Sequence, residues 1–240
     1  MTLKDRVVVV TGAAGGLGQT VTRSLAEQGV RLALLGRRAD RLESLARELR
    51  LEDDRYLAHA VDLGDPGSAQ AAAETVIERF GRAEILLHLV GGWTGGQTID
   101  EVTAGEVANM IDQHLWTTFY LAQAFVPHLV ANGWGRAIVV SSPFASQPQA
   151  KGGPYAIGKA AQETLMITLA QELKGSGVTA NVLLVRTIDV KHERIREPKP
   201  QNASWTTPDE IASAVLFLCS GAANMVNGAR IPLYGGPWPS

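Results

Sequence analysis

A glycine-rich loop between a buried strand and a helix is the feature that most constrains this chain. Residues 7–10 are four consecutive valines, as expected of a parallel strand that is buried on both faces. The loop that follows is Thr-Gly-Ala-Ala-Gly-Gly-Leu-Gly, and a helical pattern then covers 19–28. In this context the backbone N–H groups of the loop can face a phosphate, and the helix dipole favours the anion. A plain tight turn would also use glycines, but the place between strand and helix favours dinucleotide binding by Thr11, Gly12, Gly15, Gly16, Leu17 and Gly18.

Strand and helix patterns alternate along the rest of the chain. Further short apolar runs predict strands at 32–35, 56–61, 85–90, 137–140, 178–185 and 229–233. Helical patterns lie between them, and the longest, over 104–131, could be broken near Pro127. This alternation predicts an α/β fold, a single-domain doubly wound parallel sheet of about seven strands (Rossmann-like) with helices on both faces. We expect one dinucleotide-binding and catalytic domain over 1–240, with a short substrate loop at about 187–206.

Several candidate ligand-binding residues follow directly after predicted strands. Ligands of parallel sheets bind at the carboxyl ends of the strands, so such residues gather on one rim. Besides the glycine loop, we place Arg37, Asp62, Leu63, Gly91 and Ser142 on this rim. Asp62 and Leu63 are expected at the edge of an adenine pocket, and no metal is expected.

The end of the second strand bears on the choice of cofactor. An acidic residue there would bind the ribose diol of NAD, whereas an arginine accommodates the 2′-phosphate of NADP. The chain has Gly36 followed by Arg37 and Arg38, whose planar guanidinium groups suit a phosphate. We predict NADP(H), with NAD(H) as the alternative if the two arginines only begin a solvated helix.

Tyr155 and Lys159 lie four residues apart in a predicted helix that Pro154 begins. That spacing puts both side chains on one helix face. A phenol near a helix N-terminus with an ammonium one turn away should have a lowered pKa. Such a tyrosine could act as a proton donor or acceptor near neutral pH.

Composition excludes some classes of function. The chain has 240 residues, and its net charge of -2 gives no electrostatic case for a nucleic-acid partner. No apolar run is long enough to span a bilayer, and the first strand begins too early to leave room for a signal peptide. The one cysteine, Cys219, lies on an apolar helical face and suits a buried thiol in a reducing compartment. We therefore expect a cytoplasmic protein without a membrane partner.

Taken together, these motifs resemble the short-chain dehydrogenase/reductase family over nearly the whole chain. The shared features are the loop at 11–18, Asp62, Ser142 thirteen residues before Tyr155, the segment 207–212 and the closing pair 235–236. The resemblance implies that Tyr155 transfers a proton, that Lys159 lowers its pKa and binds the nicotinamide ribose, and that Ser142 holds the substrate oxygen. Ser141 and Ser146 compete for the serine role, but the family's spacing selects Ser142. The resemblance also implies a homodimer or homotetramer that packs through the helices at 104–131 and 155–173.

Three segments depart from the family pattern. His114 stands where the family has an asparagine that helps to hold a proton-relay water, and a histidine can also donate and accept. His88-Leu89-Val90-Gly91 replaces the family's Asn-Asn-Ala-Gly. The hydrogen bonds by which the asparagine side chains brace the sheet must therefore be replaced or absent. Val185-Arg186 replaces Pro-Gly before Ile188, a cofactor-binding candidate, and Val190 takes the place of a threonine that often contacts the carboxamide.

Two functions follow from these observations. The first is an NADP(H)-dependent oxidoreductase that interconverts a carbonyl and an alcohol of a small molecule, with Tyr155 as general acid/base. The alternative is a non-catalytic NADP(H)-binding redox sensor or scaffold of the same fold. For the substrate, Trp93, Phe144 and Trp205 could line an apolar pocket. The basic residues of 191–199 could attract an acid, although Glu193 and Glu197 alternate with them.

Overall fold

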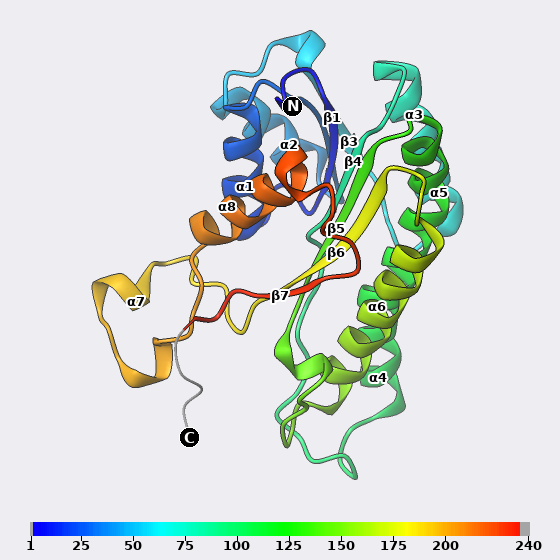
Figure 1. The fold of residues 1–240 in the computed structure, drawn as a ribbon. Coiled ribbons are helices and arrows are strands. Elements are labelled where there is room, and N and C mark those ends of the chain that lie inside the picture. The colour runs from blue at the N-terminus through cyan, green and yellow to red at the C-terminus, as the bar shows by residue number, and fades with distance from the viewer. Residues whose placement is uncertain (1, 236–240) are drawn as a thin grey trace.

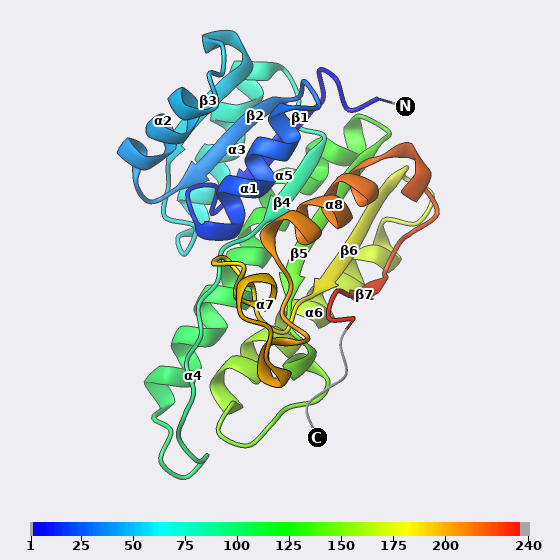
Figure 2. The same ribbon diagram turned by 90° about the vertical axis from the view of Figure 1, so that its left-hand side faces the viewer.

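Seven parallel strands form one sheet in the order β3-β2-β1-β4-β5-β6-β7 (Figures 1 and 2). The computed structural model describes residues 2–235. The strands are β1 (Val7–Thr11), β2 (Arg31–Gly36), β3 (Tyr56–Ala60), β4 (Ile85–His88), β5 (Gly135–Ser141), β6 (Val178–Leu184) and β7 (Arg230–Pro232). The α-helices are α1 (Gly16–Ala26), α2 (Ala39–Glu48), α3 (Pro66–Phe80), α4 (Ala104–Ile111), α5 (Thr117–Ala131), α6 (Gly153–Glu172), α7 (Glu193–Arg196) and α8 (Pro208–Cys219). Short 3₁₀ turns lie at Asp53–Arg55, Pro143–Ala145, Pro200–Asn202 and Gly221–Ala223.

Helices cover both faces of the sheet, as Figure 1 shows. Val7 and Val9 of β1 pack into one core with α3, α5 and α6, whereas Val8 and Val10 pack into the other with α1, α2 and α8. All four valines are fully buried, which explains why the strand is a continuous apolar run instead of an alternating one. The predicted doubly wound parallel sheet is therefore confirmed.

The predicted break of the long helix near Pro127 is wrong. Helix α5 continues through Pro127, and Phe125 and Leu129 on either side of that proline are buried in the core. The interruption lies earlier, where Asp112–Trp116 forms a π-helical turn between α4 and α5. Packing of the apolar face stabilises α5 despite the missing N–H donor, so the local rule for proline is overridden.

The segment predicted as a short substrate loop contains two helical turns, α7 and the 3₁₀ turn at Pro200–Asn202. The Asp189 carboxylate accepts the backbone N–H groups of Glu193 and Arg194 at 2.8 and 2.9 Å, which fixes the start of α7. The base of the loop closes by a bridge between Ile188 and Thr206.

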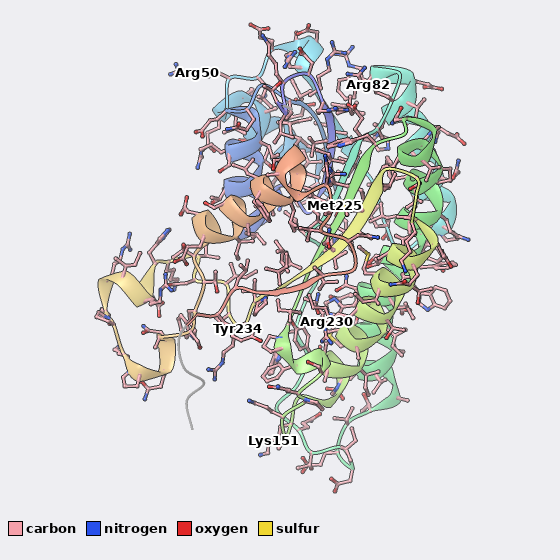
Figure 3. All side chains as sticks on the ribbon, in the orientation of Figure 1. Arg50, Arg82, Lys151, Met225, Arg230 and Tyr234 are labelled. Carbon is pink, nitrogen blue, oxygen red and sulfur yellow. The ribbon has the colours of Figure 1, made fainter. Side chains whose placement is uncertain are left out.

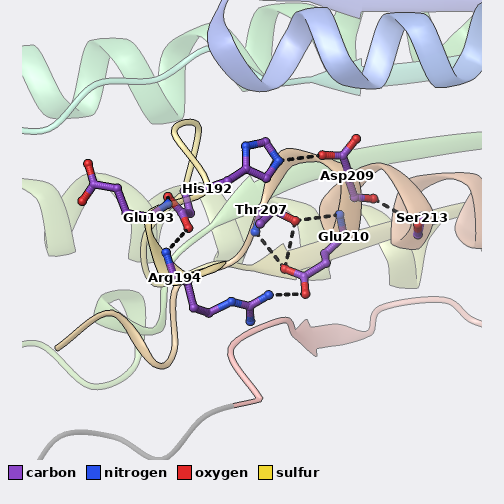
Figure 4. A network of polar contacts seen from close by, with 8 residues as sticks. His192, Glu193, Arg194, Thr207, Asp209, Glu210 and Ser213 are labelled. Atoms are coloured by element: carbon purple, nitrogen blue, oxygen red, sulfur yellow. Dashed lines mark hydrogen bonds and ion pairs between the residues drawn. The ribbon is translucent and has the colours of Figure 1, made fainter. Parts of the chain in front are cut away.

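This loop is also fastened to the first turn of α8 (Figure 4). His192 lies 3.0 Å from Asp209, and Arg194 pairs with Glu210. Glu210 at the same time completes a capping box with Thr207. The loop is thus held at its base and also through His192 and Arg194.

Three remaining predictions concern Cys219, membrane-spanning helices and the closing glycine pair. Cys219 is fully buried, and burial raises the pKa of its thiol to about 12, so it is an inert core residue. None of the helices within residues 2–235 is both long and apolar enough to cross a lipid bilayer. Of the closing glycine pair, Gly236 lies outside the described residues.

Candidate active site

Two adjoining cavities open at the carboxyl ends of the strands, and Leu89, Val90 and Gly91 line both. The Arg37 cavity, of about 540 Å³, is lined by Gly12, Gly15, Gly36, Arg37, Val61, Asp62, Leu63, Gly64, Leu89, Val90, Gly91, Asn109, Asp112, Gln113 and Thr117. The Tyr155 cavity, of about 380 Å³, is lined by Leu17, Leu89, Val90, Gly91, Gly92, Trp93, His114, Val140, Ser141, Phe144, Tyr155, Lys159, Val185, Arg186, Thr187 and Ile188. The two cavities therefore lie side by side and include Arg37, Asp62, Leu63 and Gly91 of the predicted rim, whereas Ser142 is buried and lines neither.

The glycine loop forms a tight cradle at the start of α1. Gly12 has a φ of 72°, and a Cβ on Gly18 would lie 2.1 Å from the Gly12 carbonyl oxygen, so only glycine fits at position 18. Gly15 caps α1 without a side-chain hydrogen bond, which leaves the first-turn N–H groups to a ligand. The Thr11 side chain does not face the ligand side of the loop. Its hydroxyl is hydrogen-bonded to His88 Nδ1, which holds the start of the loop against β4. These residues fit the phosphates of a dinucleotide.

The two arginines after β2 differ in their surroundings. Arg37 lines the Arg37 cavity, whereas the Arg38 guanidinium pairs with Asp40 at 2.7 Å and is absent from the lining. Asp62 and Leu63 line the same cavity, and the Asp62 carboxylate also accepts the N–H of Gly64. Arg37 is thus the better placed of the two for a 2′-phosphate.

Tyr155 lies in the first turn of α6 and lines the Tyr155 cavity, and the Ser142 side chain is near enough to its hydroxyl to influence its pKa. Phe144 and His114 contact its ring edge-on, at centroid distances of 6.2 and 5.5 Å. The prediction of a lowered tyrosine pKa is wrong for this arrangement. Burial raises the pKa of Tyr155, the Ser142 side chain opposes that rise, and Glu163 adds to it. Desolvation of the phenolate outweighs the field of the helix terminus.

Lys159 is buried one turn below Tyr155. Its Nζ donates to the Val140 carbonyl and to Gln162 Oε1, both at 2.8 Å. Burial lowers the pKa of this ammonium to about 7, and Glu163 partly opposes the change. A lysine that is only partly charged near neutral pH stabilises the Tyr155 phenolate less than a full positive charge would. This is a second reason why the predicted lowering of the Tyr155 pKa is wrong.

Gln162 is a site residue that sequence reasoning missed. Its amide nitrogen donates to the Thr118 hydroxyl at 2.9 Å, and Thr118 donates to the His114 carbonyl at 2.6 Å. A chain of hydrogen bonds therefore links Lys159 to the π-helical turn. The signal in the sequence is the spacing, because a residue three positions after Lys159 lies on the same helix face.

The same network fixes His114 within the π-helical turn. His114 Nε2 donates to the Gly92 carbonyl at 3.1 Å, which leaves Nδ1 as the acceptor, and Nδ1 is buried without a partner in the described structure. Burial lowers the pKa of His114 to about 3, so the ring is neutral. A Cβ on Gly91 would lie 3.3 Å from this Nδ1 and 3.8 Å from Lys159 Nζ. The same Cβ would lie 2.8 Å from His114 Cε1, so the His114 ring packs directly against Gly91.

His88 replaces the brace that the amide residues of the family pattern would supply. The Thr11 hydroxyl lies 2.7 Å from His88 Nδ1, and His88 Nε2 lies 3.1 Å from the Thr117 hydroxyl. Thr117 donates its own proton to the Gln113 carbonyl, so it must accept from Nε2, and Nδ1 must accept from Thr11. The bonds that tie β1 and β4 to the π-helical turn are therefore replaced, not absent.

The rival serines have other partners. Ser141 donates to the Glu163 carboxylate at 2.5 Å, and Ser146 lies against the Pro143 carbonyl. Arg230 on β7 points toward α6 (Figure 3) and pairs with Glu163 at 2.6 Å. Glu163, also missed from the sequence, anchors β5 and β7 to the helix that carries Tyr155.

The segment after β6 forms the outer wall of the Tyr155 cavity. Val185 is buried, Ile188 lines the cavity, and the Val190 methyl groups lie about 3 Å from where a Cβ on Gly16 would stand. Among the predicted aromatic residues, Trp93 and Phe144 line the cavity and Trp205 does not. Arg186 is the charged residue on this wall.

Comparison with known proteins agrees with this geometry. The family model described as short chain dehydrogenase matches residues 6–200. D-threitol dehydrogenase from Mycolicibacterium smegmatis is 29% identical over 98% of this chain and 93% of its own length. 1,6-Dihydroxycyclohexa-2,4-diene-1-carboxylate dehydrogenase from Pseudomonas putida is 28% identical over 97% and 93%. The crystal structure of L-sorbose reductase from Gluconobacter frateurii, complexed with NADPH and L-sorbose, superimposes with a TM-score of 0.84 at 27% identity, covering 98% of each chain. The chain therefore belongs to the short-chain dehydrogenase/reductase family of nicotinamide-dependent oxidoreductases.

Proposed function

We propose that this protein is an NADP(H)-dependent oxidoreductase that interconverts a carbonyl and an alcohol, with Tyr155 as general acid/base. The observation that carries the proposal is the placement of Tyr155, near Ser142, one helix turn from the buried Lys159, in a cavity that adjoins the one lined by Gly12 and Gly15. The whole chain would act as one catalytic unit. The nicotinamide, when bound, supplies or accepts the hydride.

Tyr155 and Ser142 would act on the substrate oxygen. In carbonyl reduction, the Tyr155 hydroxyl donates its proton to that oxygen, and the Ser142 hydroxyl holds it while negative charge develops. Because the pKa of Tyr155 is raised, the phenol form that donates a proton prevails in the resting site. Alcohol oxidation needs the phenolate instead, so its rate should increase with pH.

His114 would serve in the relay that reprotonates Tyr155. We propose that a water donates to His114 Nδ1 and accepts from Lys159 Nζ, because Nδ1 is buried without a partner in the described structure. This water would give the buried Nδ1 the partner that it lacks. Lys159, with a pKa of about 7, is suited to release and regain a proton at neutral pH.

The preference for NADP(H) rests on Arg37 and on Gly36, which carries no carboxylate. We propose that Arg37 binds the 2′-phosphate and that Arg38, engaged with Asp40, contributes mainly to the local positive field. The test is the ratio of NADPH to NADH affinity before and after Arg37→Ala. A ratio that stays constant would assign the preference to another residue.

The test of catalysis is Tyr155→Phe. We expect turnover to drop by about 10²–10⁴-fold, the range of general acid–base catalysis, with NADPH affinity nearly unchanged. The assay follows nicotinamide absorbance with a panel of ketones and aldehydes. Near-wild-type turnover in the variant would refute the role of Tyr155.

The alternative, a non-catalytic redox sensor or scaffold, predicts NADPH binding without turnover on the whole panel. One substrate with robust turnover removes it. For assembly, we propose a homodimer or homotetramer through α5 and α6, because Trp116 and Ile157 are exposed apolar residues beside or on these helices. A monomer in sedimentation equilibrium would contradict this.

The relatives span two kinds of substrate. The M. smegmatis enzyme is named for an uncharged polyol, and the P. putida enzyme for a ring diol that carries a carboxylate. We propose a small hydroxylated or oxo compound of this general kind.

A further inference from the structure

Trp93 presents an uncovered indole on the wall of the Tyr155 cavity. The residue is 61% exposed, although tryptophan is on average well covered in folded proteins. Within residues 2–235 its side chain forms no hydrogen bond, ring contact or cation–π contact. A large apolar ring without a partner beside a candidate catalytic tyrosine is a surface that a ligand can cover.

The glycines that follow Trp93 fix the place of its ring. A Cβ on Gly95 would lie 2.8 Å from Trp93 Cζ2 and 2.7 Å from the Lys151 carbonyl oxygen, so the six-membered ring of the indole lies against the Gly95 backbone. The N–H of Gly96 donates to the same Lys151 carbonyl at 2.7 Å. Lys151 directly precedes the first turn of α6, which carries Tyr155. The segment that carries the indole is therefore fastened to the segment that carries the candidate catalytic phenol.

Trp93 also lies away from the phosphate cradle. It lines the Tyr155 cavity together with Phe144, whose ring meets the Tyr155 ring edge-on at a centroid distance of 6.2 Å. It is absent from the lining of the Arg37 cavity, which contains two glycines of the phosphate cradle. This placement favours the substrate over the phosphates of the cofactor as the group that covers the indole.

The lining of the cavity suits an apolar substrate body. Leu89, Val140, Val185 and Ile188 line it besides the two aromatic residues. An indole attracts a second ring in an offset-stacked or edge-to-face arrangement, beyond the gain from buried area alone. A ring also loses less conformational freedom on binding than a flexible chain of the same size. The wall that contains Trp93 therefore favours a ring over a chain.

We propose that Trp93 determines specificity by packing on an apolar ring of the substrate. The enzyme would then act on ketones, or the corresponding alcohols, in which such a ring is attached directly to the reacting carbon or lies one carbon from it. The carbonyl would react at Tyr155 while the ring covers the indole. This inference rests on the proposed carbonyl–alcohol activity of the same site.

Ring and chain ketones of equal carbon number test the proposal. The pairs are cyclohexyl methyl ketone with 2-octanone and phenylacetone with 2-nonanone, with erythrulose as a polar reference. All four apolar compounds are methyl ketones, so the members of a pair differ in the shape of the apolar part. We expect the wild-type enzyme to prefer at least one ring ketone to its chain partner in kcat/KM.

Removal of the indole should abolish this preference. In Trp93→Ala the kcat/KM for the preferred ring ketone should decrease roughly fivefold to fiftyfold, mainly through KM, because the ring loses both its stacking partner and the apolar area that the indole covers. The kcat/KM for the chain ketone should change by less than about twofold, since a flexible chain can lie against the rest of the apolar wall.

Three further variants and one binding measurement sharpen the test. Trp93→Phe keeps a flat ring and should fall between wild type and Trp93→Ala. Gly95→Ala displaces the indole without removing it and should also lower the ring-to-chain ratio. Phe217→Ala, which removes a 47% exposed aromatic residue outside the cavity, should leave that ratio unchanged. NADPH affinity, titrated through the emission of the nucleotide itself, and the thermal midpoint should be the same in Trp93→Ala and wild type.

Each contrary result has a distinct meaning. If Trp93→Ala lowers NADPH affinity, lowers ring and chain ketones alike or changes the oligomeric state, the indole serves the cofactor, the fold or the assembly, and the inference is overturned. If the wild-type enzyme prefers no ring ketone to its chain partner but reduces a chain ketone or erythrulose, the inference fails and the proposed function stands. If it binds NADPH and reduces no carbonyl compound, the proposed function itself fails.

Discussion

Replacing Lys159 with methionine should remove a pH-dependent cost of folding. Burial lowers the pKa of this lysine from 10.5 in the unfolded chain to about 7 in the folded protein. Between these values the unfolded chain binds more protons than the native protein, so wild-type stability rises with pH. Below about pH 7 the lysine is protonated in both states, and its unfavourable contribution is constant.

The magnitude follows from proton linkage. One pH unit between the two pKa values corresponds to about 1.36 kcal/mol for one proton. Because Lys159 is still about half-protonated at pH 7 in the folded protein, the free energy of unfolding of wild type relative to Lys159→Met should rise by about 2.3 kcal/mol from pH 7 to pH 9. Methionine also leaves the Val140 carbonyl and Gln162 Oε1 without their donor, at a cost of about 1–3 kcal/mol for each. The cost of these lost hydrogen bonds does not depend on pH in this range. A change of the stability difference with pH can therefore be assigned to the titration of Lys159.

Urea denaturation at pH 6, 7, 8 and 9, followed by circular dichroism, measures this difference. Lys174→Met is the matched control, because Lys174 is exposed just after α6, and its difference from wild type should not change with pH. Glu163 favours the charged form of Lys159, so in the Glu163→Gln background the slope should begin at a lower pH. An equal stability difference at pH 7 and pH 9 would refute the conclusion that burial lowers the pKa of Lys159.

Three further predictions concern the supports of the site. His114→Asn should keep most of the turnover, because an amide can accept and donate at the same place, whereas His114→Leu should lose about tenfold or more; equal kinetics for both would remove His114 from the relay. Gly18→Ala should abolish NADPH binding in a fluorescence titration, because its Cβ would collide with the Gly12 carbonyl, and unimpaired binding would contradict the cradle. His88→Leu should destabilise the protein by about 1–3 kcal/mol in urea denaturation, since it leaves the Thr11 hydroxyl buried without its partner, and an unchanged midpoint would show that the brace is dispensable.

The features that sequence predicted best depend on local pattern. The valine run of β1 and the glycine loop at 11–18 indicate their structures directly, because two-sided burial and tight backbone approach each permit few residue types. The partners of the rival Ser141 and Ser146 agree with the spacing that selected Ser142, although the catalytic role of Ser142 stays a prediction.

The features that sequence did not predict depend on distant neighbours. The pKa of Tyr155 is set by how completely the folded chain excludes water, which no four-residue spacing reveals. The π-helical turn at Asp112–Trp116 carries no breaker residue, and the visible breaker, Pro127, lies within a continuous helix. Arg186 could be recognised as a departure from the family pattern, but its side of the cavity could not be foreseen.

The two buried histidines beside the site affect how its kinetics should be interpreted. An inflection near neutrality in a pH–rate profile is commonly assigned to an imidazole. Here both His88 and His114 have a pKa of about 3, because burial disfavours the charged ring, so neither changes charge in an ordinary assay. Such an inflection would belong to the amine of Lys159, and histidine-directed acylating reagents would leave it in place.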